Sequence, residues 1–355
     1  MPSVRELIDN YQDTVWALLG LHNELTFDDE KKKPLAESAY TSRHTEEVTL
    51  PDGAKITPDI HVVVPGGLSV GDIKISFAQD GDDRKKADIE AQLRKYDAAL
   101  VHLATASKRS KDECGVVLLV HQSRAGSATR FGQSTSFEHN FAVLSYNRTD
   151  QAKVYVTLEL RHGVLVPAHK HTKLSANPIQ INVDVLFRFG DVRFYDAAPP
   201  DLYVAEIFWM HILSFLAAEA MNPGDGALPK TVEVEVNKAA QLLADGYSIR
   251  QICRNAKQCP SNDQMRRVFV MLKRMHLAKE VSPDRYSVTR VDFRDVRAAF
   301  EKRLKKADAD DARREARRKA TETRRAARRK AREEEKAAKR AKKGNGRQGE
   351  LFDPS

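Results

Sequence analysis

Apolar residues in the first part of the chain recur with the period of a helix and then with that of strands. From residue 4 to residue 18 they recur every three or four positions, which predicts an amphipathic helix ending near Gly20. The runs 46–50, 55–64 and 68–77 have strand-like composition and are separated by Pro-Asp-Gly and Pro-Gly-Gly turn signals. Three strands joined by short turns are therefore predicted to follow the helix.

A second helix and a fourth strand complete this predicted core. Residues 83–107 carry an apolar row at helical spacing, and residues 115–121 form a continuous apolar run that suits a central strand. The order helix, three strands, helix and strand predicts an α/β fold with a mixed sheet. Strand-like patches after about residue 125 predict additional strands in the same domain, which we place at residues 1–200. These patches are 141–146, 154–160, 179–189 and 192–195.

The second half of the chain predicts a smaller α-rich domain and a charged helix. Residues 201–292 follow two prolines and contain three helical segments and then two strand-like ones, which is the order of a winged helix. The helical segments are 237–243, 248–255 and 261–277, and the strand-like ones are 278–281 and 286–289. Residues 293–343 are almost entirely Ala, Arg, Lys and Glu, which predicts one solvated basic helix. Residues 344–355 are predicted to be a disordered tail.

The chain carries a formal charge of +9 and has a pI of about 9.3, but this charge is unevenly distributed. Residues 301–355 hold 21 Lys and Arg against 11 Asp and Glu, so residues 1–300 have a formal charge of −1. The high pI is therefore a property of the tail. It does not indicate that the folded body is one large nucleic-acid-binding surface.

The cysteines and the most apolar segment indicate a cytoplasmic protein. The spacing of the three cysteines matches neither a disulfide framework nor a four-thiolate metal site, so small buried residues in a reducing compartment are expected at Cys114, Cys253 and Cys259. Acidic residues interrupt the apolar N-terminal segment, so no secretion signal is predicted. Charges also interrupt the apolar segment 202–221, which predicts a buried helix and no membrane contact.

Two aspartates on consecutive predicted strands are candidates for a metal site. Strand alternation places Asp59 on the polar face of one strand, and Asp72 and Lys74 on the polar face of the next. A turn joins the two strands, so the aspartates can face each other at about 5 Å, a separation that one hard cation can bridge. The alternative is a half-buried hairpin whose polar residues merely face water.

Gln92 and Tyr96 lie one turn apart on the predicted helix that follows these strands. Both side chains are expected to point from the same side of the helix toward the strand ends that carry the aspartates. Tyr96 also falls in register with Leu93 and Leu100, so a role in the core is an equal alternative. Three further histidines, His162, His169 and His171, lie on a predicted loop, where surface positions are favoured over a zinc site.

The series Pro58-Asp59, Asp72-Ile73-Lys74, Gln92 and Tyr96 resembles the PD-(D/E)xK nuclease superfamily, in its RecB-like branch with a QxxxY motif. The resemblance covers about residues 1–125. It implies a restriction-endonuclease-like core and the metal-dependent hydrolysis of phosphodiester bonds in DNA, with RNA left open.

The resemblance also implies a role for each motif residue. Asp59, Asp72 and the carbonyl of Ile73 would bind Mg²⁺ or Mn²⁺, and Lys74 would position the attacking water. Gln92 and Tyr96 would steady the substrate or the water. An acidic residue on or after the first helix, either Glu24 or Glu37, would complete the site. The four cysteines of the iron–sulfur members are absent, so no cluster is expected.

The last helix of the predicted winged helix offers a candidate DNA-binding face. Its apolar residues are expected to face inward, which leaves a polar face that suits a DNA groove. The candidate contacts on this face and at the tip of the hairpin are Asn262, Gln264, Arg266, Arg267 and Arg285. A winged helix that docks protein, or an ordinary solvated helix, is the alternative.

The sequence therefore predicts a metal-dependent nuclease whose winged helix and basic tail help to bind duplex DNA. By resemblance, its context would be bacterial restriction, repair or anti-phage defence, as a homodimer or with a partner protein of the defence system. A DNA-binding or scaffold protein in which the nuclease fold no longer cuts is the alternative.

Overall fold

The computed structural model describes residues 4–28, 33–34, 41–43, 47–64, 67–74, 77–78, 82–150, 152–166, 174, 177–186, 190–195, 199–221, 226–251 and 257–345. Residues 1–292 form one compact unit, and residues 293–355 form a second one. The expected boundary at residue 200 lies inside the first unit and stays a prediction.

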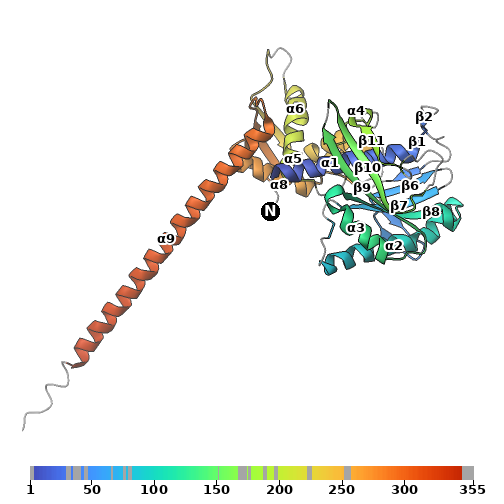
Figure 1. Ribbon diagram of the computed structural model, residues 1–355. Coiled ribbons are helices and arrows are strands. Elements are labelled where there is room, and N and C mark those ends of the chain that lie inside the picture. Colours follow the sequence, from blue (N-terminus) through green and yellow to red (C-terminus); the bar gives the residue numbers. More distant parts are fainter. Residues whose placement is uncertain are drawn as a thin grey trace, which may run out of the picture. The chain divides into compact units, whose positions relative to one another are not determined.

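The first unit is mixed α/β and is built on a seven-stranded sheet (Figure 1). The strands lie in the order β11, β10, β9, β8, β7, β6 and β3. The pairs β7–β8 and β8–β9 are parallel, and the other neighbours are antiparallel. The bounds are Thr41–Arg43 (β3), Ile60–Val64 (β6), Gly67–Lys74 (β7), Cys114–His121 (β8), Asn140–Asp150 (β9), Val154–Gly163 (β10) and Ile179–Asn182 (β11).

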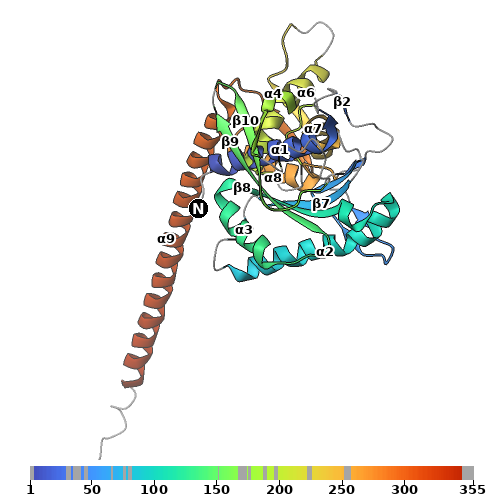
Figure 2. The same cartoon turned by 45° about the vertical axis from the view of Figure 1, so that its right-hand side comes forward.

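Helices cover both faces of this sheet (Figure 2). Helix α1, Val4–Thr26, packs on one face, and its Thr14 hydroxyl lies 2.6 Å from the hydroxyl of Tyr146 on β9. Helices α2, Asp83–Ser107, and α3, Ala125–Ser134, cover the other face. Between these layers, β7 and β8 are almost wholly buried, as the apolar run in β8 predicted.

The predicted strands before β7 are placed differently in the structure. The segment expected at 46–50 forms β4, Val48–Thr49, which pairs with β5, Lys55–Ile56, in a separate two-stranded sheet. The strand expected at 55–64 is interrupted around Pro58, because proline has no N–H for a strand ladder. The third core strand is instead β3, which was not predicted.

The later part of the sheet agrees with the predicted additional strands in β9, β10 and the start of β11. The strand expected at 179–189 ends at Asn182, where the short helix α4, Val183–Leu186, begins. Of the segment 192–195, Phe194 forms a single bridge to Ser248. Helix α3 was not predicted.

Residues 201–292 contain helices and a separate three-stranded sheet of order β12, β14, β13. The strands are Thr231–Glu235 (β12), Ala278–Ser282 (β13) and Arg285–Thr289 (β14), and the helices are Asp201–Ile207 (α5), Leu213–Glu219 (α6), Val236–Tyr247 (α7) and Asn262–Arg274 (α8). A π-helical turn, Phe208–Ile212, joins α5 to α6. Strand β12 was not predicted, and the helix expected at 248–255 is a short 3-10 turn, Ile249–Gln251, in its described part.

The apolar segment Asp201–Glu219 is, within the described part of the chain, the one helix long and apolar enough to cross a membrane. About 61% of its most apolar window is buried inside the protein, which is typical of a core helix. This agrees with the buried helix predicted from the charges that interrupt it.

The second unit contains α9, a single helix that runs from Val296 to Asn345. Its side chains from residue 313 to residue 336 are exposed on every side, as the composition predicted. Lys319 and Glu315, four residues apart, form an ion pair at 2.8 Å. The tail expected to be disordered lies outside the described residues from residue 346 onward.

Candidate active site

Five side chains that the sequence singled out lie together beside β7 and under α2. Asp59 immediately precedes β6, and the register that pairs Ile60 with Gly71 places Asp59 opposite Asp72. Asp72 and Lys74 belong to β7. Gln92 and Tyr96 come from α2, which begins after Asp82, whose carboxylate accepts a hydrogen bond from the N–H of Lys85.

The two aspartates form a buried carboxyl pair. Asp72 is only 2% exposed, and although Asp59 keeps some exposed surface, protein surrounds its carboxyl group. The N–H of Ile73 donates to Oδ2 of Asp59 at 3.0 Å. Burial, and next the negative charge of Asp72, raise the pKa of the Asp59 carboxyl well above its ordinary value of 3.8. Asp59 therefore keeps its proton to a higher pH than an exposed aspartate does.

Lys74 provides one positive charge at this pair. Its ammonium group contacts Oδ2 of Asp72, and it also donates to Oε1 of Gln92 at 3.1 Å. The Lys74 side chain is 26% exposed, so it reaches from the buried carboxylate toward solvent. With two carboxyl groups and one ammonium group, the cluster has a net charge of −1 when fully ionised.

Gln92 and Tyr96 fix Lys74 from the helix side. The side-chain amide of Gln92 donates to the Tyr96 hydroxyl at 2.8 Å, and that hydroxyl donates to the carbonyl of Thr57 at 3.3 Å. Burial, and next the charge of Asp72, raise the pKa of Tyr96 above its ordinary value, so this hydroxyl stays neutral. Tyr96 belongs to the core, as one interpretation of the sequence expected, and its hydroxyl also belongs to the polar network, while its role toward a substrate stays a prediction.

The donor set suits a hard divalent cation. Asp59 and Asp72 supply carboxylate oxygens, which Mg²⁺ and Mn²⁺ prefer, and a cation would remove the repulsion between them. No group of three or more His, Cys, Asp and Glu side chains that could hold a metal occurs within the described residues, so the pair would depend on backbone oxygens and water for further ligands. Glu24 is described as half-buried on α1, and Glu37 lies outside the described residues.

The cysteines and histidine among the other candidate ligands that the structure describes, Cys114, Cys259 and His162, do not join this cluster. Cys114 and Cys259 are both buried, and burial raises the pKa of Cys114 to about 11, so the Cys114 thiol is not a reactive thiolate. His162 packs beside Gly132 of α3. Cys253, His169 and His171 lie outside the described residues.

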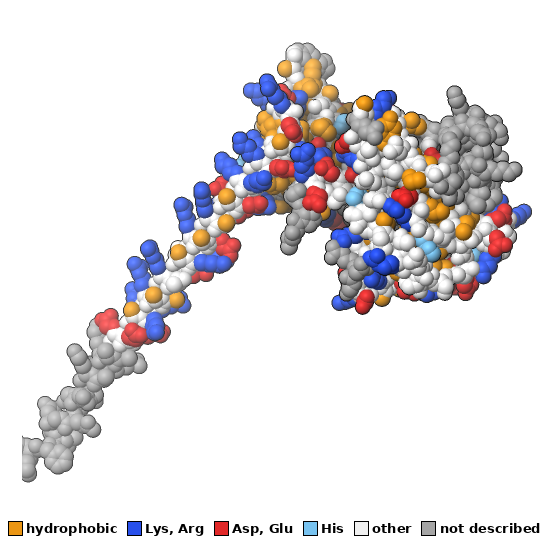
Figure 3. All heavy atoms as spheres, in the orientation of Figure 1, with side chains coloured by type: hydrophobic (Ala, Val, Ile, Leu, Met, Phe, Trp, Pro, Cys, Tyr) orange, Lys and Arg blue, Asp and Glu red, His pale blue; other side chains and the backbone are white. Residues whose placement is uncertain are grey.

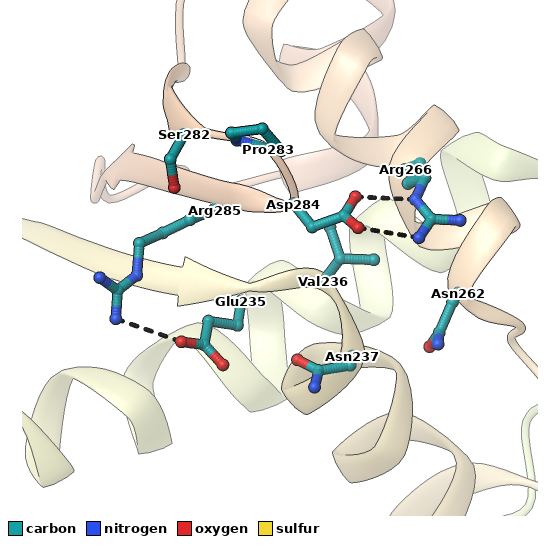
Figure 4. Close-up of a pocket in the computed structure, with 9 residues that line it drawn as sticks. All are labelled: Glu235, Val236, Asn237, Asn262, Arg266, Ser282, Pro283, Asp284 and Arg285. Carbon is teal, nitrogen blue, oxygen red and sulfur yellow. Dashed lines mark hydrogen bonds and ion pairs between the residues drawn. The ribbon is translucent and has the colours of Figure 1, made fainter.

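Three of the five candidate DNA-binding residues line a pocket of about 460 Å³ between α8, the start of α7 and the β13–β14 turn (Figure 4). Asn262 and Arg266 of α8 line this pocket together with Arg285 of β14. Arg266 makes two hydrogen bonds to Asp284, at 2.7 and 2.8 Å, and Arg285 makes one to Glu235 at 3.1 Å. Acidic partners therefore already offset both arginines.

Two more of these candidates pack against the start of α5. Arg267 is exposed but makes hydrogen bonds to Asp201 at 3.1 and 3.2 Å. Gln264 was expected on the exposed face, and this placement is wrong because Gln264 is fully buried. Its amide donates to the carbonyl of Pro199 and to Asp201, which lie far away in the sequence. Gln264 thus anchors the start of α8 and offers no surface to a ligand.

Two contacts at the carboxyl pair that were not predicted from the sequence are made by backbone groups: the N–H of Ile73, whose carbonyl was named as a metal ligand, and the carbonyl of Thr57. Every residue has such backbone groups, so the sequence gives no indication of these two contacts, and only the folded structure shows them. Comparison with protein-family models, with curated proteins and with solved structures gave no match. The geometry of the cluster is therefore the main indication of a function.

Proposed function

We propose that this protein is a metal-dependent nuclease of the PD-(D/E)xK type that hydrolyses phosphodiester bonds in DNA. The observation that carries the proposal is the convergence of Asp59, Asp72 and Lys74 from neighbouring strands, with Gln92 and Tyr96 above them. A solvated hairpin would not bury two carboxyl groups against each other. Their burial costs free energy, which is typical of a site built for a ligand.

Asp59, Asp72 and the carbonyl of Ile73 would hold Mg²⁺ or Mn²⁺. When bound, such an ion lowers the pKa of a coordinated water and offsets the charge that develops at the phosphorus. The N–H of Ile73 keeps the Asp59 carboxylate oriented through its hydrogen bond. Asp72 holds the Lys74 ammonium group beside the carboxyl pair.

Lys74 positions the attacking water and stabilises negative charge on the scissile phosphate. Gln92 restrains this ammonium group by accepting one of its hydrogens, and Tyr96 in turn restrains Gln92. The neutral Tyr96 hydroxyl is anchored on the Thr57 carbonyl, close to Asp59 in the chain. The network thus limits the rotation of a long side chain before the substrate binds.

The arrangement of elements supports the fold that we propose. Helix α1, strands β3, β6 and β7, helix α2 and strand β8 follow one another as in a restriction-endonuclease-like core, with β8 parallel to β7. The helices, the β12–β14–β13 sheet and the β13–β14 turn of residues 201–292 follow the order of a winged helix. In this proposal Asn262, Arg266, Arg267 and Arg285 contact DNA, and the arginines exchange their carboxylate partners for phosphates.

We further propose that the protein acts in the cytoplasm, in restriction, repair or anti-phage defence, as a homodimer or with a partner protein. RNA is an alternative substrate, which the same chemistry would hydrolyse.

Cleavage of supercoiled plasmid DNA tests the proposed function. With Mg²⁺ or Mn²⁺ the wild-type protein should nick or linearise the plasmid, and with EDTA it should not. Asp72→Asn and Lys74→Met should each lower the rate by about 100-fold or more. Asp112→Asn and Lys111→Met are matched controls, because both residues are exposed and lie beside the opposite end of the parallel β7–β8 pair.

Cleavage that is equally fast in the Asp72 and Lys74 variants would overturn the assignment. A protein that binds DNA with wild-type affinity and never cuts it, with either metal, would instead favour the non-catalytic DNA-binding or scaffold protein.

A further inference from the structure

The central part of α9 has an unusual composition. Residues 313–332 contain eleven Lys and Arg, two Glu, and otherwise only Ala and Thr. The helix continues without interruption through this stretch, and its basic side chains project into solvent (Figure 3). At 1.5 Å per residue these twenty residues span about 30 Å.

The arginines of this stretch lie on one side of the helix. At 100° per residue, all nine fall within an arc of about 160°, which we name the arginine face. Its members are Arg313, Arg314, Arg317, Arg318, Arg324, Arg325, Arg328, Arg329 and Arg332. Lys305, Lys319 and Lys330 lie on the opposite side, among alanines and Thr323.

An internal repeat produces this one-sided distribution. Residues 313–319 read RREARRK, and residues 324–330 read RRAARRK, eleven positions later. Eleven residues are close to three helical turns, so the second copy returns to the same side, about 16.5 Å along the axis. A run of charges that only keeps a helix soluble would not need its arginines to return to the same side of the helix.

Most of the arginine face is not neutralised by the acidic residues that the structure describes. Arg313 lies 3.9 Å from Asp310 and Arg318 lies 3.7 Å from Glu322, which are long ion pairs at exposed positions. The other seven arginines have no carboxylate partner within 4.0 Å in the described part of the chain. By contrast, Arg266, Arg267 and Arg285 around α8 are all paired with acids.

The chemistry of this face selects among anionic partners. A membrane surface is disfavoured, because the uncharged residues of the stretch 313–332 are all Ala or Thr, so it has no large apolar side chain to insert among lipids. Guanidinium groups bind phosphate through two parallel hydrogen bonds. A straight row of such groups matches a stiff polyanion, and duplex DNA carries one charge per about 1.7 Å of its axis and bends little over about 30 Å.

We infer that the arginine face of α9 binds the phosphate backbone of duplex DNA without reading its sequence, and that it supplies more of the affinity than the paired arginines of α8 and β14. The inference rests on the proposed function for the nature of the partner. It does not depend on the metal site, so it can be tested without catalysis.

The test is the binding of the full-length protein to a labelled 30-base-pair duplex DNA in EDTA, over a series of salt concentrations. The triple variant Arg317→Gln, Arg324→Gln and Arg328→Gln should weaken binding about tenfold or more at low salt. It should also reduce the slope of log affinity against log salt by about 3, if each arginine contacts one phosphate. The matched control is Lys305→Gln, Lys319→Gln and Lys330→Gln, which removes the same charge from the opposite side and should change affinity by less than about threefold.

Circular dichroism of each variant checks that α9 still folds, and the substitution of the same three arginines by lysine should recover most of the affinity, because it restores the charge. Equal losses in the two glutamine variants, or no loss in either, would overturn the inference. Tighter binding to single-stranded DNA, to RNA or to anionic vesicles than to the duplex would overturn the choice of partner.

The result can be separated from that of the proposed function. Asp72→Asn should bind the duplex as tightly as the wild type in EDTA, whether or not the wild type cleaves plasmid DNA. A protein that binds duplex DNA through the arginine face but does not cleave it would contradict only the proposed function. Equal DNA affinities of the arginine and lysine variants would contradict only the inference about α9.

Discussion

At the scale of single residues, the raised pKa of Asp59 links the candidate site to pH. Because the folded-state pKa of Asp59 lies above its unfolded-state value, its contribution to the stability of the metal-free protein is complete only in acid. That contribution is lost as the pH rises through the folded-state pKa. A divalent cation competes with the retained proton, so acid should weaken metal binding while it stabilises the metal-free fold.

We predict that the affinity for Mn²⁺ rises by up to about tenfold per pH unit as the pH increases through the raised pKa of Asp59, with one proton released per ion. Titration calorimetry in buffers of different ionisation enthalpy measures both quantities. Asp59→Asn should abolish the proton release, and Asp112→Asn should leave it unchanged. An affinity for Mn²⁺ that does not vary with pH would show that the ion does not compete with a proton on Asp59.

A second residue-scale prediction concerns Gln264, which is buried and not available to DNA. Gln264→Ala should lower the free energy of unfolding by about 2 kcal/mol, because it leaves the Pro199 carbonyl without its donor. Asn262→Ala, at the exposed start of the same helix, should change stability by less than about 0.5 kcal/mol. Chemical denaturation and DNA titration distinguish the two variants. Reduced DNA affinity of Gln264→Ala at unchanged stability would show that this amide reaches the ligand.

At the scale of elements, the close approach of β7 and β8 depends on Gly71. A Cβ atom at this position would lie 2.1 Å from the carbonyl oxygen of Val117, so no side chain fits without movement of the backbone. Because Asp72 follows directly on the same strand, a shift of β7 would also displace the carboxyl pair. The spacing of these two strands therefore supports the site.

We predict that Gly71→Ala destabilises the protein by about 3 kcal/mol and weakens Mn²⁺ binding. Gly126→Ala in α3 is the control, since the nearest atom to its new Cβ, in the flexible Arg130 side chain, lies 3.8 Å away. That control should be neutral or stabilising by up to about 1 kcal/mol, because alanine favours the helix more than glycine does. Thermal and urea unfolding measure both variants. Equal stability of the two alanine variants would show that β7 and β8 can separate freely.

The sequence predicted the long, strongly patterned elements and missed the short or weakly patterned ones. Helix α2 was expected over residues 83–107 and has these bounds, because its apolar row and its cap are both local signals. Strand β3 has three residues and no apolar alternation, and α3 is rich in Gly and Ser, so neither has a local signal. Strand β12, in contrast, alternates Val with Glu, so it could have been predicted from the sequence.

The candidate site was more predictable than the sheet around it. The order of the motif residues, the alternation of faces along a strand and the spacing along a helix predicted five residues for this site, and the structure places them together. These residues are Asp59, Asp72, Lys74, Gln92 and Tyr96. The partners of the α8 and β14 arginines could not be foreseen, because Asp201 and Glu235 lie 66 and 50 residues from Arg267 and Arg285 in the chain. Only folding brings such charges into contact.

At the scale of the whole molecule, positive charge and candidate chemistry belong to different units. The carboxyl pair lies in the unit formed by residues 1–292, and residues 1–300 carry a formal charge of −1. The excess of positive charge lies in α9 and the tail. In the proposed function, the step that needs a cation and the surface that binds DNA would therefore belong to different units, and experiments should be able to separate them.

We predict that a chain ending after residue 312 binds Mn²⁺ with wild-type affinity and binds duplex DNA more weakly, with the largest loss at low salt. Calorimetry and fluorescence anisotropy measure the two affinities, and the unfolding temperature of the first unit is the control for folding. Wild-type DNA affinity of the shortened chain at every salt concentration would show that α9 serves another purpose.

The proposed function depends above all on the binding of a divalent cation between Asp59 and Asp72. Anomalous X-ray scattering from a crystal soaked in Mn²⁺ would locate that ion. We predict an anomalous peak within about 2.5 Å of a carboxylate oxygen from both aspartates, with Lys74 moved away from Asp72 but still in reach of Gln92. An anomalous map without a peak between the two carboxyl groups, at a Mn²⁺ concentration that supports plasmid cleavage, would contradict it.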